Sequence, residues 1–132
     1  MQQHEFLQYK TNIKEFDEDH FRIINLFETM LVEPDFRKVA SFISLFPFEW
    51  ALHIMLEERF MYENKYSHLD FHIKQHTSIS NLIKQLDCNV KDGESEIQIR
   101  SKLQELFNMI KYHISTEDKA YGVAHNTYDF KS

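Results

Sequence analysis

The sequence has few of the residues that make tight turns. Its 132 residues include only two glycines and two prolines, whereas a sheet protein of this length needs such residues at many turns. This scarcity argues against β-sheet folds and predicts an all-α protein. The length suits one compact domain with a real core rather than two domains. Twelve phenylalanines, six tyrosines and one tryptophan supply large side chains for that core.

Cysteine, clustered positive charge and long apolar runs are also scarce. The lone Cys88 cannot form an internal disulfide. The net charge is −6 and lysine and arginine form no cluster, so we expect neither nucleic acid nor a membrane surface as a partner. The N-terminus lacks the pattern of a signal peptide, and no stretch looks long and apolar enough to span a bilayer. We therefore expect a soluble cytoplasmic protein.

Hydrophobic spacing and turn residues divide the single predicted domain, residues 1–132, into an arm, a bundle and a tail. The arm covers about residues 1–16, the bundle 17–121, and the polar tail begins at Gly122. Asp17 is predicted to cap the first helix, and Pro47 to kink or split the second. Four helices joined by short turns predict an up-down-up-down four-helix bundle. The expected helices cover about residues 17–32, 36–64, 68–87 and 95–121.

Two pairs of polar residues lie inside apolar stripes, and the members of each pair are four residues apart. His53 and Glu57 form one pair, and His72 and His76 form the other. Residues four apart share one face of a helix, so each pair can direct two donor atoms at one point. A carboxylate in an apolar stripe is rarely buried unless it is paired or binds a metal, because desolvating its charge is costly. Both pairs therefore predict inward-facing metal ligands.

The other two helices add further candidates with the same character. His20 precedes Ile24 in the stripe of the first helix, and His113 follows Ile110 in that of the fourth. Spacing leaves the acidic partner of His113 open, although regular helix geometry favours Glu117, four residues on, over Asp118.

The third helix carries three histidines in one row, and spacing alone does not choose between His68 with His72 and His72 with His76. The row is about 12 Å long, which is too long for a single metal centre. His68 stands at the start of the helix and is the more exposed position. One of the three is therefore expected to be a bystander.

The number and type of donors indicate a dinuclear centre. Five imidazoles and two carboxylates exceed what one tetrahedral zinc ion holds, and they suit two five- or six-coordinate ions such as iron or manganese bridged by the carboxylates. No glutamate stands three residues before any histidine, which argues against the carboxylate-rich di-iron bundles. The chain has no nucleophile-elbow serine, glycine-rich phosphate loop or paired cysteines.

Taken together, these residues resemble the pattern of the hemerythrins, and the loop lengths resemble those of the bacterial single-domain members. The resemblance covers about Phe16 to Tyr121. It rests on Asp17 to His20, on His53-Glu57-Glu58-Met61, on His72 to His76, and on His113-Ile114-Asp118-Tyr121.

The resemblance implies two iron ions bridged by an oxo or hydroxo group and by Glu57 and Asp118. It selects His76 over His68, and it selects Asp118 over Glu117, which implies a local irregularity such as a π-bulge in the last helix. The implied ligands are His72, His76 and His113 for one iron and His20 and His53 for the other. The second iron would keep an open position for dioxygen.

The implied function is reversible dioxygen binding for storage, delivery or sensing, and not catalysis. The alternatives are a di-iron redox enzyme acting on peroxide or nitric oxide, or an iron-handling protein. Ile24 and Ile110, one turn from His20 and His113, would line the oxygen pocket, with Phe21 and Trp50 as further candidates. Met109 stands where many hemerythrins have tryptophan, and because this side chain is flexible and oxidisable, the resemblance does not extend to the tightness of the pocket.

Overall fold

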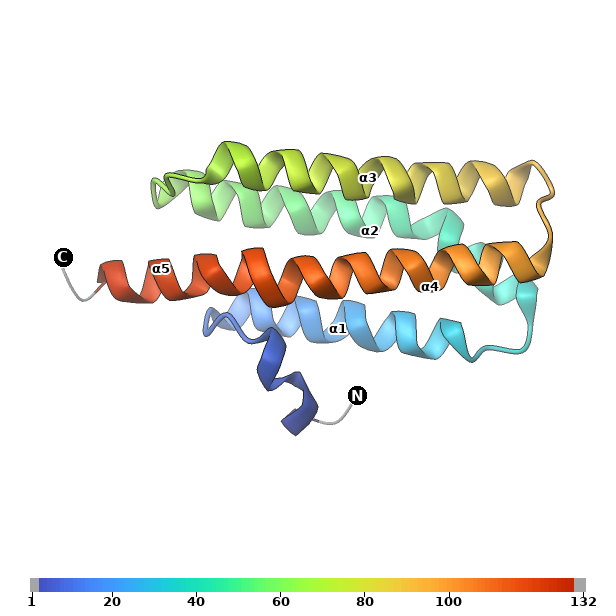
Figure 1. Ribbon diagram of the computed structural model, residues 1–132, viewed down its shortest axis with the longest axis horizontal. Coiled ribbons are helices and arrows are strands. Elements are labelled where there is room, and N and C mark those ends of the chain that lie inside the picture. The colour runs from blue at the N-terminus through green and yellow to red at the C-terminus, as the bar shows by residue number, and fades with distance from the viewer. Residues whose placement is uncertain (1–2, 130–132) are drawn as a thin grey trace.

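The computed structural model describes residues 3–129, which form four long helices packed side by side (Figure 1). The last of these is continuous but contains a π-helical turn, η2. Helix α2 packs against α3, α3 against α4, and α1 against both α2 and α4, so the predicted bundle is confirmed. The bounds are α1 Lys14–Leu31, α2 Phe36–Glu63, α3 Leu69–Lys91, α4 Glu96–His113, η2 Ile114–Asp118 and α5 Lys119–Asp129.

Both ends of the bundle carry more helix than predicted. The arm contains a 3-10 helix, η1 Gln3–Tyr9, and the predicted polar tail is helix α5. The tail folds because one side of it is covered: the ring of His125 packs against Phe60, with 5.2 Å between centroids. Helix α3 also continues four residues beyond its predicted end, to Lys91, and Cys88 lies exposed within it. A histidine on a terminal arm, such as His4, is expected to be solvated rather than a ligand, and the side chain of His4 lies outside the described residues.

Asp17 does not cap α1, which begins three residues earlier at Lys14 with no side-chain cap. The carboxylate of Asp17 instead accepts hydrogen bonds from the backbone N and the hydroxyl of Thr11, at 2.7 and 2.8 Å, and from the backbone N of Asn12, at 3.1 Å. Asn12 has a φ of 63°, a left-handed conformation that asparagine tolerates better than most residues. Asp17 therefore fastens the turn after the arm to the first turn of α1.

The apolar core is divided into two clusters. In the larger one the ring of Phe27 contacts the rings of Phe42, Phe46 and Phe107 at 4.9 to 5.2 Å. Helix α2 passes through this cluster unbroken despite Pro47. The smaller cluster consists of Ile13, Phe16, Met61 and Tyr121. On each bundle helix, the buried histidines and carboxylates lie between apolar side chains of the two clusters, or next to those of one cluster.

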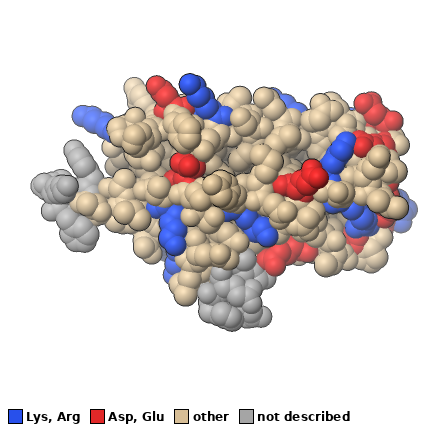
Figure 2. All heavy atoms as spheres, in the orientation of Figure 1, with Lys and Arg blue, Asp and Glu red and all other residues tan. Residues whose placement is uncertain are grey.

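Helix α2 is long and apolar enough, by length and composition alone, to cross a membrane, so the prediction that no stretch has this character is wrong. A core helix of a bundle meets the same criterion, and α2 does place Val39, Ile43, Phe46 and Trp50 in the core. Many of its other apolar side chains are exposed. On the face shown in Figure 2, acidic and basic side chains are interspersed.

At Gly122 the backbone of α5 lies close to the backbone of Thr11 after the arm. A Cβ at this position would lie 2.2 Å from the carbonyl oxygen of Thr11. We expect Gly122→Ala to lower the free energy of unfolding by about 2–4 kcal/mol, because the backbone of one of the two segments must move. Thermal melting followed by circular dichroism would show a loss of roughly 5–10 °C.

Gly93→Ala is the matched control for this substitution. Gly93 has a φ of +80° with nothing within 4 Å of an added Cβ, so only backbone strain of about 1 kcal/mol is expected. Equal losses in the two variants would show that the Thr11 contact is unimportant.

Candidate metal centre

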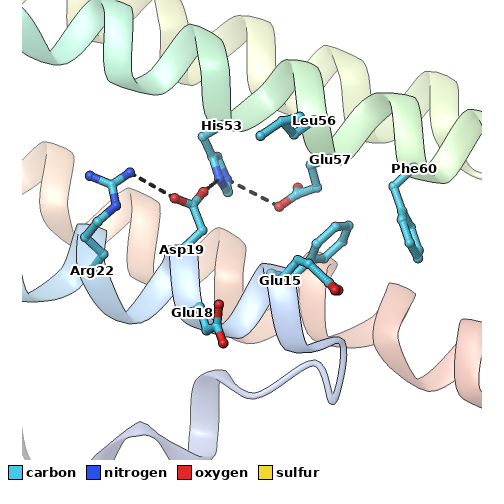
Figure 3. Close-up of a pocket in the computed structure, with 9 residues that line it drawn as sticks. Glu15, Glu18, Asp19, Arg22, His53, Leu56, Glu57 and Phe60 are labelled. Carbon is cyan, nitrogen blue, oxygen red and sulfur yellow. Dashed lines mark hydrogen bonds and ion pairs between the residues drawn. The ribbon is translucent and has the colours of Figure 1, made fainter.

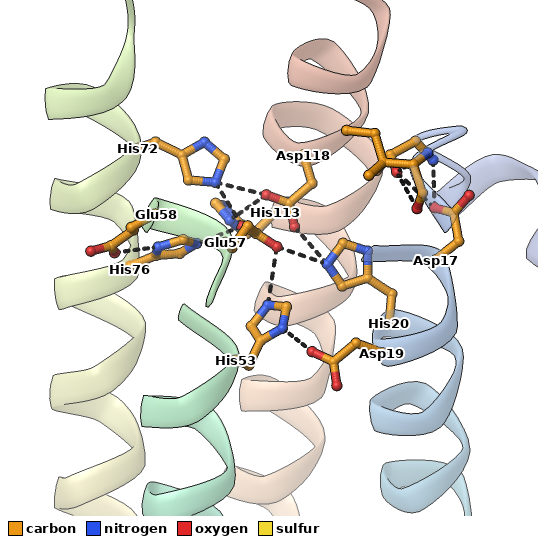
Figure 4. Close-up of polar contacts among 12 residues, drawn as sticks. Asp17, Asp19, His20, His53, Glu57, Glu58, His72, His76, His113 and Asp118 are labelled. Atoms are coloured by element: carbon orange, nitrogen blue, oxygen red, sulfur yellow. Dashed lines mark hydrogen bonds and ion pairs between the residues drawn. The ribbon is translucent and has the colours of Figure 1, made fainter. Parts of the chain in front are cut away.

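All seven side chains predicted as ligands are buried and meet at one place in the bundle (Figure 4). None is more than 4% exposed. Every bundle helix contributes at least one of them. They are His20 on α1, His53 and Glu57 on α2, His72 and His76 on α3, His113 at the end of α4, and Asp118 at the end of η2.

Their potential ligand atoms form two overlapping groups, in each of which all atoms lie within 4.8 Å of one another. Only Glu57 and Asp118 belong to both groups. Apart from these two carboxylates, the first group holds His72, His76 and His113, and the second holds His20 and His53. This is the division that the resemblance implied.

Glu57 directs one oxygen to each group. Its Oε1 lies 3.0 Å from Nε2 of His72 and 3.1 Å from Nε2 of His76. Its Oε2 lies 3.1 Å from Nε2 of His20 and 3.3 Å from Nε2 of His53. A carboxylate with this orientation can bridge two ions held by the two sets of imidazoles.

Asp118 has the same orientation from the opposite helix. Its Oδ1 lies 2.7 Å from Nε2 of His72 and 3.0 Å from Nε2 of His113, and its Oδ2 lies 3.1 Å from Nε2 of His20. The two carboxylates therefore divide their oxygens between the groups in the same way.

The π-helical turn η2 explains why Asp118 and not Glu117 occupies this position. Over Ile114–Asp118 the helix is wider than a regular α-helix, which brings the fifth residue after His113 onto the inward face. Asp118 is fully buried, whereas Glu117 is half-exposed and belongs to neither group. The preference for Glu117 drawn from regular spacing is wrong, and the irregularity implied by the resemblance is confirmed.

His68 lies outside both groups. It is exposed at the N-cap position of α3, where its ring contacts that of Tyr66 with 5.7 Å between centroids. We expect His68→Ala to leave the iron content unchanged. His72→Ala, one turn further along the same helix, should lose at least one iron because His72 contacts both carboxylates. Iron analysis of the two purified variants tests this, and loss of iron from His68→Ala would contradict the assignment of residues to the centre.

Two further carboxylates hold the rings of two of these histidines from behind. Nδ1 of His76 donates a hydrogen bond to Glu58 at 2.6 Å, and Nδ1 of His53 donates to Asp19. Arg22 in turn donates to Asp19 and pairs with Glu49. A carboxylate behind an imidazole fixes the ring and makes its other nitrogen a stronger metal donor. Glu58 follows Glu57 in the sequence, but Asp19 lies 34 residues from His53, and sequence analysis did not find its role.

Within the buried cluster, the negative charge of the carboxylates is opposed by protons on the histidines. Burial lowers the pKa of His20, but the nearby carboxylates of Asp118 and Glu57 outweigh this effect and raise the pKa to about 10. The same opposing effects raise the pKa of His72 to about 9. Burial opposes ionisation of Glu57, but the surrounding histidines lower its pKa well below the usual value. The residues therefore supply anionic bridges together with nitrogens that must give up protons to bind a metal.

The donor atoms fit a metal better than they fit one another. Nε2 of His53, His76 and His113 and both oxygens of Asp118 are buried without a well-formed hydrogen bond, although all of them lie within 3.3 Å of other donors. Buried polar atoms are rarely left in this state, because each costs about 1–3 kcal/mol. Two cations, one in each group, would give every one of these atoms a partner.

The surroundings of the cluster differ in part from expectation. Ile24 and Ile110 are fully buried one turn from His20 and His113. Trp50 packs on the rings of His53 and His76, at 5.1 and 5.9 Å between centroids. Met109 is 43% exposed and borders a surface hollow with Leu82 and Leu106. It therefore faces away from the centre.

A cleft of about 530 Å³ between α1 and α2 reaches the second group from outside (Figure 3). His53 and Glu57 are among its lining residues, and Glu15, Glu18, Asp19 and Arg22 also line it. Phe16 and Phe60 border it on the side of the smaller apolar cluster. The cleft thus approaches the centre from the side of the second group.

The comparison with protein families agrees with this geometry. The model of the hemerythrin HHE cation-binding domain matches residues 11–123. The chain belongs to the hemerythrin family. Membership implies a metal-binding helical domain, and in this hemerythrin the buried histidines and carboxylates provide the site. Neither the curated proteins nor the solved structures gave a match.

Proposed function

We propose that this hemerythrin holds two iron ions in the buried cluster and binds dioxygen reversibly, for storage, delivery or sensing. His72, His76 and His113 would hold one ion, and His20 and His53 the other. Glu57, Asp118 and an oxo or hydroxo group would bridge them. The observation that carries the proposal is the orientation of the two carboxylates. Glu57 and Asp118 each direct one oxygen to each set of histidines.

The donor set favours iron. Five imidazoles and two carboxylates exceed the coordination of one zinc ion, and no cysteine belongs to either group. When bound, two ferrous ions supply the two electrons that reversible reduction of dioxygen requires. The second group has one histidine fewer than the first, so dioxygen would enter there.

Apolar side chains beside the cluster would keep water from the bound ligand on one side. Ile24, Ile110 and Trp50 are buried in the larger apolar cluster, and Trp50 covers two of the histidine rings. An apolar wall on this side disfavours proton entry from bulk water, which would otherwise discharge reduced oxygen as peroxide.

An optical titration tests the proposal. The protein is loaded with ferrous iron without air, exposed to dioxygen, and then returned to an inert atmosphere. We expect a visible charge-transfer band that appears with dioxygen and fades when dioxygen is removed. Direct conversion to a stable ferric form without a reversible band would contradict oxygen binding while leaving the ligand set intact.

The cleft in Figure 3 favours a second candidate, a di-iron enzyme acting on peroxide or nitric oxide. It brings an open cleft, with Glu15, Glu18, Asp19 and Arg22 in its lining, to His53 and Glu57, and a polar substrate could use this approach. Sustained turnover of hydrogen peroxide by the iron-loaded protein, at a rate far above that of free iron, would support the enzyme. A single slow oxidation without turnover would support the oxygen binder.

A further inference from the structure

The outward face of α2 carries a stripe of exposed apolar side chains. We call Leu45, Phe48, Leu52, Met55 and Leu56 the α2 stripe. Each is between 55% and 75% exposed, so no other part of residues 6–127 covers it. Glu49 lies on its flank and is occupied by a salt bridge to Arg22 of α1.

The stripe is too large to be ordinary surface. If a large apolar side chain has roughly 200 Å² of surface, the exposed fractions leave about 600 Å² of the stripe open to solvent. Patches of this size on a monomer usually mark an interaction site. Two stripes together would supply about 1,200 Å², which is already at the lower end of the range of specific dimers before their polar rims are added.

The spacing of the stripe is that of a helix-pairing seam. Ser41, Leu45, Phe48, Leu52 and Met55 follow one another at alternating steps of four and three, the 3.5-residue repeat of paired helices. Within it, the four positions 45, 48, 52 and 55 are placed symmetrically about residue 50. In an antiparallel pair, Leu45 of one chain would face Met55 of the other, and Phe48 would face Leu52.

Charged residues at the two ends of the stripe favour an antiparallel over a parallel pair of α2 helices. Arg37 stands thirteen residues before residue 50 and Glu63 thirteen residues after it. Both side chains are exposed, at 92% and 58%, and within the chain Arg37 pairs with Asp35 and Glu63 with Arg59. An antiparallel pair would place Arg37 of each chain near Glu63 of the other, whereas a parallel pair would oppose like charges at both ends.

We propose that the α2 stripe is the interface of a two-fold, antiparallel dimer of this chain. A two-fold axis brings the same patch of both copies together, which is what the palindromic spacing and the opposite end charges require. Leu56 belongs both to the stripe and to the lining of the cleft at His53, so the second copy would also border that approach to the centre.

Molar mass in solution tests the dimer. Light scattering on the iron-loaded protein should give about 32 kDa, twice the 16.0 kDa of the chain. Leu52→Lys should reduce this to the monomer mass without loss of helix by circular dichroism, because Leu52 is exposed. Ile97→Lys is the matched control, since Ile97 is an exposed apolar residue on α4, and it should stay dimeric. A monomer mass for the unchanged protein at every concentration up to its solubility limit would overturn the proposal.

Charge exchange tests the antiparallel orientation. Arg37→Glu and Glu63→Arg should each raise the dimer dissociation constant by roughly tenfold, and combining them should restore it. A double variant no better than either single variant would overturn the antiparallel arrangement. A monomer that instead sediments with phosphatidylcholine vesicles would show that the stripe faces a membrane and would overturn the dimer.

Discussion

Glu57→Gln is expected to reduce the iron content from two ions per chain to fewer than one. Glu57 belongs to both groups of donors and directs one oxygen at each. An amide has the same shape but no charge, and its nitrogen cannot serve as a ligand, so one ion loses an anionic donor and the bridge is broken. Iron analysis after anaerobic loading and removal of free metal measures the effect.

Glu58→Gln provides the control at the neighbouring position. Glu58 accepts a hydrogen bond from Nδ1 of His76 but belongs to neither donor group. Both ions should remain, with affinity weakened about 10- to 100-fold by the loss of support for the ring. Equal iron contents in the two variants would show that Glu57 is not a bridge.

The gap in melting temperature between iron-loaded and metal-free protein is expected to widen as the pH rises from about 6.5 to 9. The pKa of His20 is raised to about 10 and that of His72 to about 9 by the buried carboxylates. A raised pKa stabilises the folded state below the unfolded value of about 6.5, and this stabilisation is lost as the pH rises toward 9 and 10. Iron binds neutral imidazole and carries the positive charge itself, so the loaded protein does not depend on these protons.

We expect the metal-free protein to lose at least about 2 kcal/mol over this range, or roughly 5 °C in melting temperature. In acid the direction reverses, because the lowered pKa values of Glu57 and Asp118 stabilise the fold only above their unfolded values near pH 4. Calorimetry of both forms at intervals of pH measures the gap. A gap that narrows between pH 6.5 and 9 would contradict the charge balance proposed for the cluster.

Much of the fold and of the site follows from sequence because both depend on the same repeat. His53, Glu57, His72 and His76 stand in apolar stripes with helical spacing, and the structure buries all four. The shortage of glycine and proline leaves few places for the chain to turn, so the order of the helices is well defined.

The errors occur where a contact joins distant segments or a helix departs from regular geometry. Asp17 looks like a helix cap, but its contacts are with Thr11 and Asn12 in the arm. Asp118 requires the wider turn of η2, which regular spacing does not predict and only the family resemblance indicated. The hydrogen bond from His53 to Asp19 joins two helices, and no local sequence pattern predicts it.

The metal-free cluster shows why a metal is the natural occupant of this site. Removing two carboxylates and five imidazoles from water is costly, and protons alone leave several nitrogens and both oxygens of Asp118 without well-formed hydrogen bonds. Two cations would satisfy both carboxylates through their separate oxygens.

The most direct test of a bridged pair of irons is the iron count together with the magnetic state of the oxidised protein. We expect two ions per chain and no paramagnetic resonance signal from isolated ferric iron, because ions bridged through an oxo group, Glu57 and Asp118 couple their spins. One ion per chain, or two with the signal of independent ferric ions, would contradict the dinuclear centre.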